Sequence, residues 1–270
     1  MKIILWNCRG LGHPRTVHAL LRMVQHHSPD ILFLSETRLS SSSSERLRLK
    51  LQFNFCFPVL RSGLGGGLLV MWNASCPLTV SSFSSSHIDT VINLQDALSW
   101  RFTGIYGSPS TGSRPAFWSL LRRLAAASSL PWVCGGDFNE ILSNSEIAGS
   151  NGRAEYLMQN FRDALQDCAL CDIGYSGYSF TWSNNRSGTA LVEERLDRVV
   201  SSDSWSQQFL GAYLRHLASP ASDHSPLLLT ISRGPTISNR SCRFHFEEFW
   251  CKIPECESII KNSWMRMTTL

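Results

Sequence analysis

Five short polar motifs are spread along the chain, and each holds an acidic, amide or imidazole side chain. They are Trp6-Asn7-Cys8-Arg9-Gly10, Ser35-Glu36-Thr37, Gly136-Asp137-Phe138-Asn139, Arg195-Leu196-Asp197-Arg198 and Ser222-Asp223-His224. Carboxylate and carboxamide oxygens are the ligands that hard divalent cations such as Mg²⁺ or Mn²⁺ prefer, whereas a single His and no clustered Cys argue against zinc. A cation of this kind polarises a phosphoryl oxygen while a nearby base deprotonates the attacking water. The residue types therefore favour hydrolysis of a phosphate ester.

Apolar runs precede the first three motifs and predict where their polar side chains lie. Ile3-Ile4-Leu5, Ile31-Leu32-Phe33-Leu34 and Trp132-Val133 have the continuity of buried strands. Each polar group would then emerge at the end of a buried strand, which is where α/β folds collect catalytic groups. We therefore expect the dispersed motifs to form one active site.

Taken singly, each motif also has a purely structural interpretation. Asn7 and Asp137 suit turns at strand ends, and Glu36 suits a helix cap. The fourth motif could form a surface ion pair and the fifth an Asx turn. The ordered co-occurrence of all five, with Tyr106 between the second and the third, favours the functional interpretation.

Apolar periodicity predicts three helices, and β-like runs predict strands between and after them. The helices are expected from Pro14 to before Ser28-Pro29, at 117–124 behind Pro115, and at 157–168. The strands are expected at 53–60, 68–72, 78–83, 88–94, 100–106, 180–182, 191–200 and 227–231. The five strands between the first two helices suit an antiparallel meander, because turn residues separate them.

Two helix-flanked sheets packed face to face are the simplest arrangement for so many strands. We therefore predict the α/β class, as a four-layer α/β/β/α sandwich with two mixed sheets. The serine run at 40–44 is predicted to be a solvated loop that leads into a helical pattern at 45–51.

Length and composition indicate one main domain. Of the 270 residues 43% are hydrophobic, enough for a sizeable core, and no apolar run approaches the roughly 20 residues of a membrane span. Met1-Lys2 leads directly into strand-like sequence, so we expect no secretion.

The nine cysteines are an odd number at irregular spacing, which favours reduced thiols over disulfides. Cys168 and Cys171 form a CxxC pair that we expect to serve in packing. The net charge of +4 permits contact with phosphates.

In order and content, the motifs resemble the metal-dependent endonuclease/exonuclease/phosphatase superfamily. Within it the chain resembles the endonuclease domain of plant-type non-LTR (LINE-like) retroelements. The narrower resemblance is carried by Trp6 to Gly12, Gly136 to Leu142, Phe180 to Asn184, and Glu194 to Arg198 followed by Trp205. It covers residues 1–232 as the catalytic domain. Residues 233–270 resemble the connector that leads into a reverse transcriptase in longer members, and no adjacent Asp-Asp pair of the polymerase kind occurs.

The resemblance implies a role for each motif residue. Asn7, Glu36 and Asp223 would bind a Mg²⁺ or Mn²⁺ ion, and Tyr106 would orient the phosphate. Asp137 and Asn139 would act on the nucleophilic water or the transition-state oxygens. Asp197 would orient His224, whose protonated ring could donate to the scissile phosphate. The division of acid and base work between Asp137 and His224 stays open.

The substrate class is less constrained than the reaction. We expect a DNA-nicking endonuclease that acts in the nucleus, with no membrane and no obligate protein partner. Another phosphoesterase of the same fold, either a repair nuclease or a lipid or inositol phosphatase, is one alternative. For a lipid substrate, Trp72 and residues 53–57 are the only membrane-facing candidates. An inactive retroelement fragment is the other. Arg186, in the turn-rich stretch 184–194, could approach a nucleic-acid backbone or lie in an ordinary exposed turn.

Overall fold

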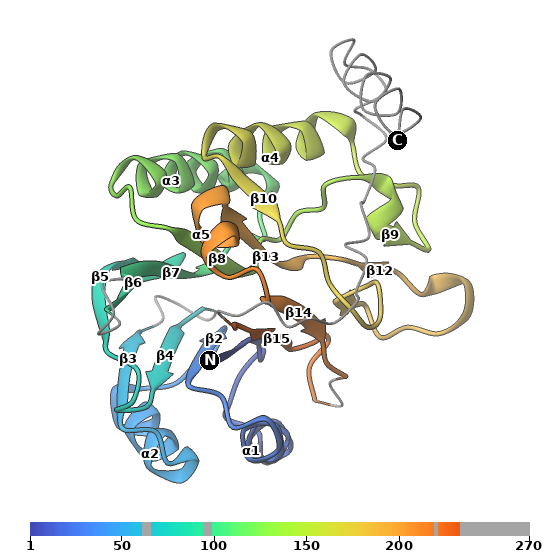
Figure 1. The fold of residues 1–270 in the computed structure, drawn as a ribbon. Coiled ribbons are helices and arrows are strands. Elements are labelled where there is room, and N and C mark those ends of the chain that lie inside the picture. Colours follow the sequence, from blue (N-terminus) through green and yellow to red (C-terminus); the bar gives the residue numbers. More distant parts are fainter. Residues whose placement is uncertain (61–65, 94–98, 219–220, 233–270) are drawn as a thin grey trace, which may run out of the picture. The chain divides into compact units, whose positions relative to one another are not determined.

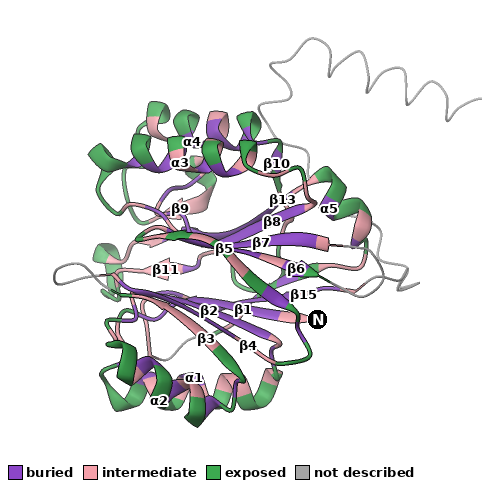
Figure 2. Cartoon of the chain, turned by 90° about the vertical axis from the view of Figure 1, so that its left-hand side faces the viewer, coloured by how far each residue is buried: buried purple, intermediate pink, exposed green. Residues whose placement is uncertain are grey.

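Two six-stranded sheets lie face to face, and helices cover the outer face of each (Figure 1; Figure 2). The computed structural model describes residues 1–60, 66–93, 99–218 and 221–232. The predicted four-layer α/β/β/α sandwich is confirmed. The predicted connector, residues 233–270, lies outside the described residues, so the division into two parts stays a prediction.

Both large sheets combine parallel and antiparallel strands. The first has the order β14 (Tyr213–His216), β15 (Leu227–Thr230), β1 (Lys2–Asn7), β2 (Ile31–Ser35), β4 (Leu68–Trp72), β3 (Phe55–Val59). The second has the order β10 (Leu170–Asp172), β13 (Asp197–Ser202), β8 (Trp132–Asp137), β7 (Ser99–Tyr106), β6 (His87–Asn93), β5 (Leu78–Ser84). A small third sheet has the order β11 (Trp182–Ser183), β12 (Glu193–Glu194), β9 (Ile147–Ala148).

The helices form the two outer layers (Figure 2). Helices α1 (Pro14–His27) and α2 (Ser41–Leu51) cover the first sheet, and α3 (Arg114–Ala126) and α4 (Glu155–Asp167) cover the second. Short α5 (Asp203–Gln208) follows β13, and the described residues include three 3₁₀ turns, at Thr111–Ser113, Asn144–Glu146 and Gly188–Ala190. None of the helices in the described part of the chain is long and apolar enough to cross a membrane.

Side-chain alternation on β1 explains why its apolar run is buried on both faces. Ile3 and Leu5 point into the core between the two sheets, whereas Ile4 and Trp6 pack in the core under α1 and α2. All four side chains are at most 2% exposed. A strand in the middle of a four-layer sandwich therefore has no polar face, and the four residues between Lys2 and Asn7 are all apolar.

Two sequence expectations are corrected by the structure. The five strands between α1 and α3 do not form one meander: β3 and β4 pair in the first sheet, and β5, β6 and β7 pair in the second. The serine run is not a loop, because α2 begins at Ser41. Ser40 is its N-cap, whose Oγ accepts a hydrogen bond from the backbone N of Ser43 at 3.2 Å.

Two of the core glycines, Gly104 and Gly136, stand where a side chain would not fit. A Cβ at Gly104 would lie 2.2 Å from the Phe33 ring of the other sheet. Gly136 in β8 has a φ of +139°, and a Cβ there would lie 2.2 Å from the carbonyl oxygen of Ile105 in β7. The strand that ends at Asp137 therefore requires glycine immediately before it.

A buried ion network holds the start of β13. Arg195 and Arg198 each contact both Glu146 and Asp172 at distances between 2.7 and 2.9 Å. Arg195 is 6% and Arg198 0% exposed. The interpretation of the fourth motif as a surface ion pair is therefore wrong: its arginines are buried and pair with acids from β10 and the Asn144–Glu146 turn.

We expect Gly136→Ala to destabilise the fold by about 3 kcal/mol or more, because the new Cβ meets backbone in a left-handed conformation. Gly112→Ala is the control, since no heavy atom lies within 4 Å of a Cβ at Gly112. The urea midpoints of both variants measure the difference. Equal midpoints would show that β8 relaxes around the added methyl group.

We expect Glu146→Gln to cost about 3 kcal/mol at pH 7. Burial raises the pKa of Glu146, but Arg198 and Arg195 outweigh burial and lower it. A carboxylate with a lowered pKa stabilises the fold above its unfolded pKa, and this contribution is lost as the pH falls through the folded pKa. The difference in stability between wild type and variant should therefore shrink below about pH 4.

The control is Glu155→Gln, because the Glu155 side chain is 72% exposed. A difference independent of pH would contradict the assignment.

Candidate active site

Parallel strand pairs bring four of the predicted site residues to one edge of the sandwich, namely the edge at which β1, β2, β7 and β8 have their C-terminal ends. Asn7 ends β1 and Glu36 directly follows β2, and these strands run parallel in register. Tyr106 ends β7 and Asp137 ends β8, and these two residues are register partners in a second parallel pair. The polar side chains therefore leave both sheets at the same edge.

Two antiparallel strands begin at this edge and add the remaining residues. Asp197 opens β13 and pairs in register with Asp137. His224 lies shortly before β15, whose first residue, Leu227, pairs with Leu5 near the end of β1. An antiparallel strand starts where its partner ends, so the last two motifs join the first three.

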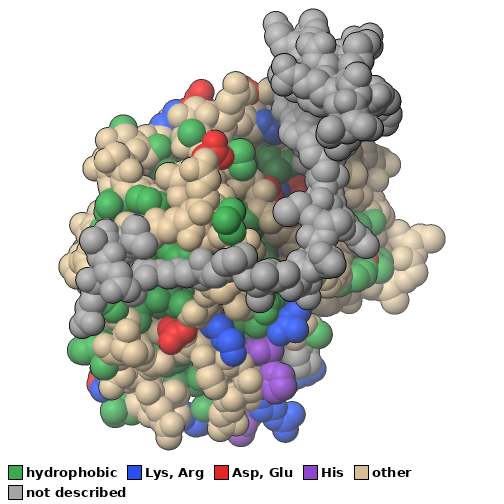
Figure 3. Space-filling model, in the orientation of Figure 1, with side chains coloured by type: hydrophobic (Ala, Val, Ile, Leu, Met, Phe, Trp, Pro, Cys, Tyr) green, Lys and Arg blue, Asp and Glu red, His purple; other side chains and the backbone are tan. Residues whose placement is uncertain are grey.

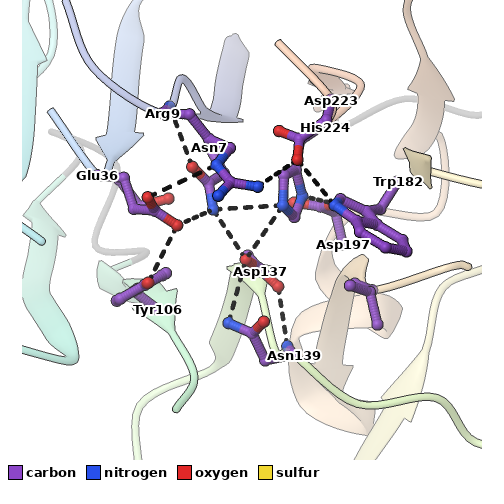
Figure 4. A network of polar contacts seen from close by, with 12 residues as sticks. Asn7, Arg9, Glu36, Tyr106, Asp137, Asn139, Trp182, Asp197, Asp223 and His224 are labelled. Carbon is purple, nitrogen blue, oxygen red and sulfur yellow. Dashed lines mark hydrogen bonds and ion pairs between the residues drawn. The ribbon is translucent and has the colours of Figure 1, made fainter. Parts of the chain in front are cut away.

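The Asn7 side chain is the centre of the hydrogen-bond network (Figure 4). Its Nδ2 donates to Glu36 Oε1 at 3.0 Å and to Asp137 Oδ2 at 2.9 Å. The same atom lies 3.5 Å from Nε2 of His224. Because Asn7 is 1% exposed, water does not compete for these contacts. One amide therefore links residues from both sheets.

His224 lies between two buried carboxylates. Its Nδ1 is 2.8 Å from Asp197 Oδ2, and its Nε2 is 3.8 Å from Asp137 Oδ2. Burial alone would lower the pKa of His224, but the Asp197 and Asp137 carboxylates outweigh it and raise the pKa. Burial raises the pKa of Asp137, and Asp197 adds to the effect, while His224 opposes it. The His224 imidazole therefore stays protonated and can donate a proton, and the neighbouring Asp137 binds a proton more strongly than an exposed Asp does.

Tyr106 and Asn139 support two of the acids. The Tyr106 hydroxyl donates to Glu36 Oε1 at 3.0 Å, and burial raises its pKa, so that it stays neutral and donates. The backbone N of Asn139 donates to Asp137 Oδ1 at 2.8 Å and its Nδ2 donates to Gly107 O at 2.9 Å. The Asp137 carboxylate is thereby fixed in one orientation.

Asp223 is held at the outer side of the site. Its Oδ2 accepts hydrogen bonds from Trp182 Nε1 at 2.9 Å and from Arg9. Ser222 Oγ donates to the carbonyl oxygen of Asn7 at 2.8 Å, which ties this loop to β1. Arg9, Trp182 and Ser222 belong to the motifs and stretches that carry the resemblance, but the sequence indicated no role for them.

Two further buried polar residues near the site, Thr181 and Glu140, lie in stretches that carry the resemblance, but the sequence indicated no role for them. Thr181 is buried, and its Oγ1 accepts hydrogen bonds from the backbone N of Leu196 at 3.0 Å and of Asp197 at 2.9 Å. Glu140, 0% exposed, pairs with Arg114 and with Arg153. Glu140 directly follows Asn139, but no spacing rule connects it with arginines that precede and follow it along the chain.

Four non-glycine residues at the site have left-handed backbone. Their φ values are 48° at Arg9, 52° at Glu36, 55° at Arg38 and 55° at Asn139. Residues in this region carry a conformational cost and cluster at functional sites. The strand ends therefore turn sharply to direct Glu36 and Asn139 into the network.

Arg186 is the one predicted site residue that the structure places outside this network. It is exposed in the connection between β11 and β12, and its backbone N donates to Asn184 Oδ1 at 3.1 Å. The connection forms a hairpin, because β11 and β12 are antiparallel with Trp182 opposite Glu194. The role of Arg186 stays a prediction.

Basic side chains also gather at the other edge of the first sheet. Figure 3 shows Lys, Arg and His side chains close together over α1. Lys2 opens β1 and its Nζ donates to the carbonyl oxygen of His27 at 2.9 Å. Burial, with His26, Arg215 and Lys2, lowers the pKa of His27. Because β1 ends at Asn7, this positive charge lies away from the site.

The donor set fits a divalent cation. Asp137, Asp197 and His224 each offer a ligand atom, and these atoms lie within 4.8 Å of one another. Hydrogen bonds already engage these atoms, between His224 and Asp197 and from Asn7 and Asn139 to Asp137. Glu36 and Asp223 are 14% and 12% exposed at the side chain and can be reached from solvent. Burial raises the pKa of Asp137 and the Asp197 carboxylate adds to this effect, so a cation at the site would favour the ionised form of Asp137.

Comparison with known proteins gives consistent matches to one fold. The endonuclease domain of TRAS1, a telomere-specific non-LTR retrotransposon, is 13% identical, with a TM-score of 0.64 over 85% of this chain and 97% of that chain. The 3′ phosphatase NExo from Neisseria, bound to a product DNA hairpin, is 17% identical, with a TM-score of 0.66 over 86% and 99%. The AP endonuclease LMAP from Leishmania major is 20% identical, with a TM-score of 0.64 over 87% and 88%.

At these identities the solved structures establish the shared fold. No curated protein sequence matches the chain. The sequence profile of the Endonuclease/Exonuclease/phosphatase family, however, matches residues 4–224. That range contains all five polar motifs and ends at His224. The chain therefore belongs to the endonuclease/exonuclease/phosphatase family.

Proposed function

We propose that the protein is a Mg²⁺-dependent endonuclease that nicks DNA. Members of this family are hydrolases of phosphodiester bonds and generally depend on a divalent metal. The observation that carries the proposal is the convergence of Asn7, Glu36, Asp137, Asp197 and His224 on one partly open edge. Mg²⁺, with Mn²⁺ as an alternative, matches the oxygen-rich donor set.

Glu36 and Asp223 would hold the cation. Asn7, which the resemblance implies as a third ligand, would instead position Glu36 through its amide. When bound, such an ion supplies positive charge to the phosphate oxygens and favours departure of the leaving group. The orientation of Asn7 supports this division, because its Nδ2 faces Glu36 and its Oδ1 accepts a hydrogen bond from the backbone N of Arg9 at 3.2 Å.

The inner groups would handle protons and phosphate. His224, protonated and held at Nδ1 by Asp197, donates from Nε2 to the phosphate. Asp137 has its raised pKa from burial and so accepts a proton from the attacking water effectively. Asn139 holds Asp137, and the neutral Tyr106 hydroxyl orients a phosphate oxygen next to Glu36.

The geometry disfavours the lipid alternative. Trp72, the apolar membrane-facing candidate, pairs in register with Ile31 at the start of β2, whereas Glu36 follows the end of β2. Trp72 also stacks on Phe55 with ring centroids 5.5 Å apart. The apolar candidates therefore lie at the edge remote from the site, where they could not guide a lipid headgroup to it.

DNA as substrate is supported by resemblance rather than by a contact. The motif stretches resemble retroelement endonucleases, and the folds of the TRAS1 endonuclease domain and of the DNA-bound Neisseria enzyme match this one. We further propose a retroelement origin and action on chromosomal DNA in the nucleus. Residues 233–270 as a connector to a reverse transcriptase stay part of this proposal.

With Mg²⁺, purified protein should convert supercoiled plasmid to open circles, and EDTA should abolish the reaction. Glu36→Ala and His224→Ala should each reduce the rate by about 100-fold or more, because one removes a cation ligand and the other a proton donor. Matched controls are Glu155→Ala and His18→Ala, which change exposed residues on α4 and α1. Gel electrophoresis of the plasmid over time measures the rates.

Folded wild-type protein that leaves the plasmid intact would overturn the endonuclease proposal. The same preparations would then be tested on oligonucleotides with a 3′-phosphate and on phosphoinositides. Activity on either substrate, lost in Glu36→Ala, would assign another phosphoesterase. Inactivity on all of them would support the inactive fragment.

Arg186→Ala should raise the KM for DNA about two- to five-fold and leave kcat nearly unchanged, because the side chain would contact a phosphate outside the reacting group. The salt dependence of DNA binding should also decrease by about one ion. Arg46→Ala, an exposed change on α2, is the control. Identical KM and salt dependence in the two variants would identify residues 184–187 as an ordinary turn.

A further inference from the structure

Arg9 lies between two acids that were assigned to the cation (Figure 4). Its guanidinium donates to Asp223 Oδ2, and its Nε is 3.9 Å from Glu36 Oε2. Asp223 and Glu36 come from opposite ends of the sequence, and Arg9 contacts both. A monovalent cation supplied by the chain therefore occupies the position between the outer carboxylates.

The atoms involved are those that a divalent ion would need. Asn7 and Tyr106 occupy Glu36 Oε1, so the outward oxygen is Oε2. Glu36 Oε2 faces Arg9 and also Arg38, whose Nη2 is 3.6 Å away, but of these two arginines Arg9 is the one that also contacts Asp223. Asp223 Oδ2 is shared between Arg9 and Trp182. A metal ion and the Arg9 guanidinium therefore compete for the same oxygens, and two cations cannot share them without strong repulsion.

The Arg9 side chain can also change its position while its backbone stays in place. Its side chain is 48% exposed, so the guanidinium can leave for solvent. Its backbone is fixed independently, because its N donates to Asn7 Oδ1 at 3.2 Å in the left-handed conformation. A planar guanidinium with several donors binds a phosphate as well as it binds a carboxylate.

We propose that Arg9 changes partner during function. In the metal-free protein it neutralises Glu36 and Asp223. When a divalent ion takes these carboxylates, Arg9 is released and binds a phosphate of the DNA backbone next to the scissile bond. Arg9 thus couples metal binding to DNA binding. The second half of this inference rests on the proposed function, and the first half does not.

The first arm measures metal binding without DNA. Calorimetric titration of metal-free protein with Mn²⁺ should show Arg9→Gln binding the ion about three- to ten-fold more tightly than wild type, because the cation that contacts both acids is gone and only Arg38, beside Glu36, remains. Arg9→Lys, which keeps the charge, should stay near wild type. Arg186→Gln is the control, since Arg186 contacts none of the acids. Thermal melts confirm that each variant is folded.

The second arm measures DNA binding in the absence of turnover. In a His224→Ala background, a labelled DNA duplex is titrated with protein, either in EDTA or in Mn²⁺. Removing Arg9 should weaken DNA binding about five-fold in Mn²⁺ and have little effect in EDTA, where Arg9 is still held by the acids. The difference between the two conditions is the coupling.

The outcomes separate this inference from the proposed function. Unchanged or weaker Mn²⁺ binding by Arg9→Gln would overturn the competition between Arg9 and the ion. An equal loss of DNA binding in EDTA and Mn²⁺ would overturn the exchange of partners. If wild type and His224→Ala bind no DNA in either condition, the DNA proposal fails, and with it the second half, while the Mn²⁺ titration still decides the first half.

Discussion

The hydrogen bond from Asn7 to Asp137 is the contact on which the active site depends. It joins the last residue of β1 in the first sheet to the last residue of β8 in the second, across 2.9 Å. Such a bond forms only if the two sheets pack at one spacing and in one register. Gly104 against the Phe33 ring sets part of that spacing, because no side chain fits between them. Packing remote from the chemistry therefore determines whether the carboxylates meet.

Concentrating four acids at one edge has an electrostatic cost, which the chain offsets at two depths. In the interior His224 lies between Asp137 and Asp197, where water is excluded and the pairing is strong. Near the surface Arg9 lies between Glu36 and Asp223 and is half exposed, so its pairing is weak and reversible. The inner charges are fixed for proton transfer, while the outer acids stay available for a cation.

Features with a local cause could be predicted from the sequence. The helix beginning at Pro14, the buried runs of β1 and β2 and the polar residues at their ends follow from periodicity and turn chemistry. Features that depend on tertiary packing could not be predicted. Nothing in residues 53–106 shows that the chain passes from one sheet to the other between Trp72 and Leu78. The serine run likewise looked like a loop until the helix that follows fixed Ser40 as its cap.

The sequence by itself determined which residue types stand at the strand ends, and through their order the family. Only the tertiary structure decided what each of them contacts. Arg195 pairs with Glu146 and Asp172 rather than with the neighbouring Asp197, Thr181 holds the backbone at Asp197, and Arg9 links Glu36 to Asp223. The reason is physical: strand periodicity and turn preferences act over a few residues, whereas these contacts join segments that meet only when both sheets have packed.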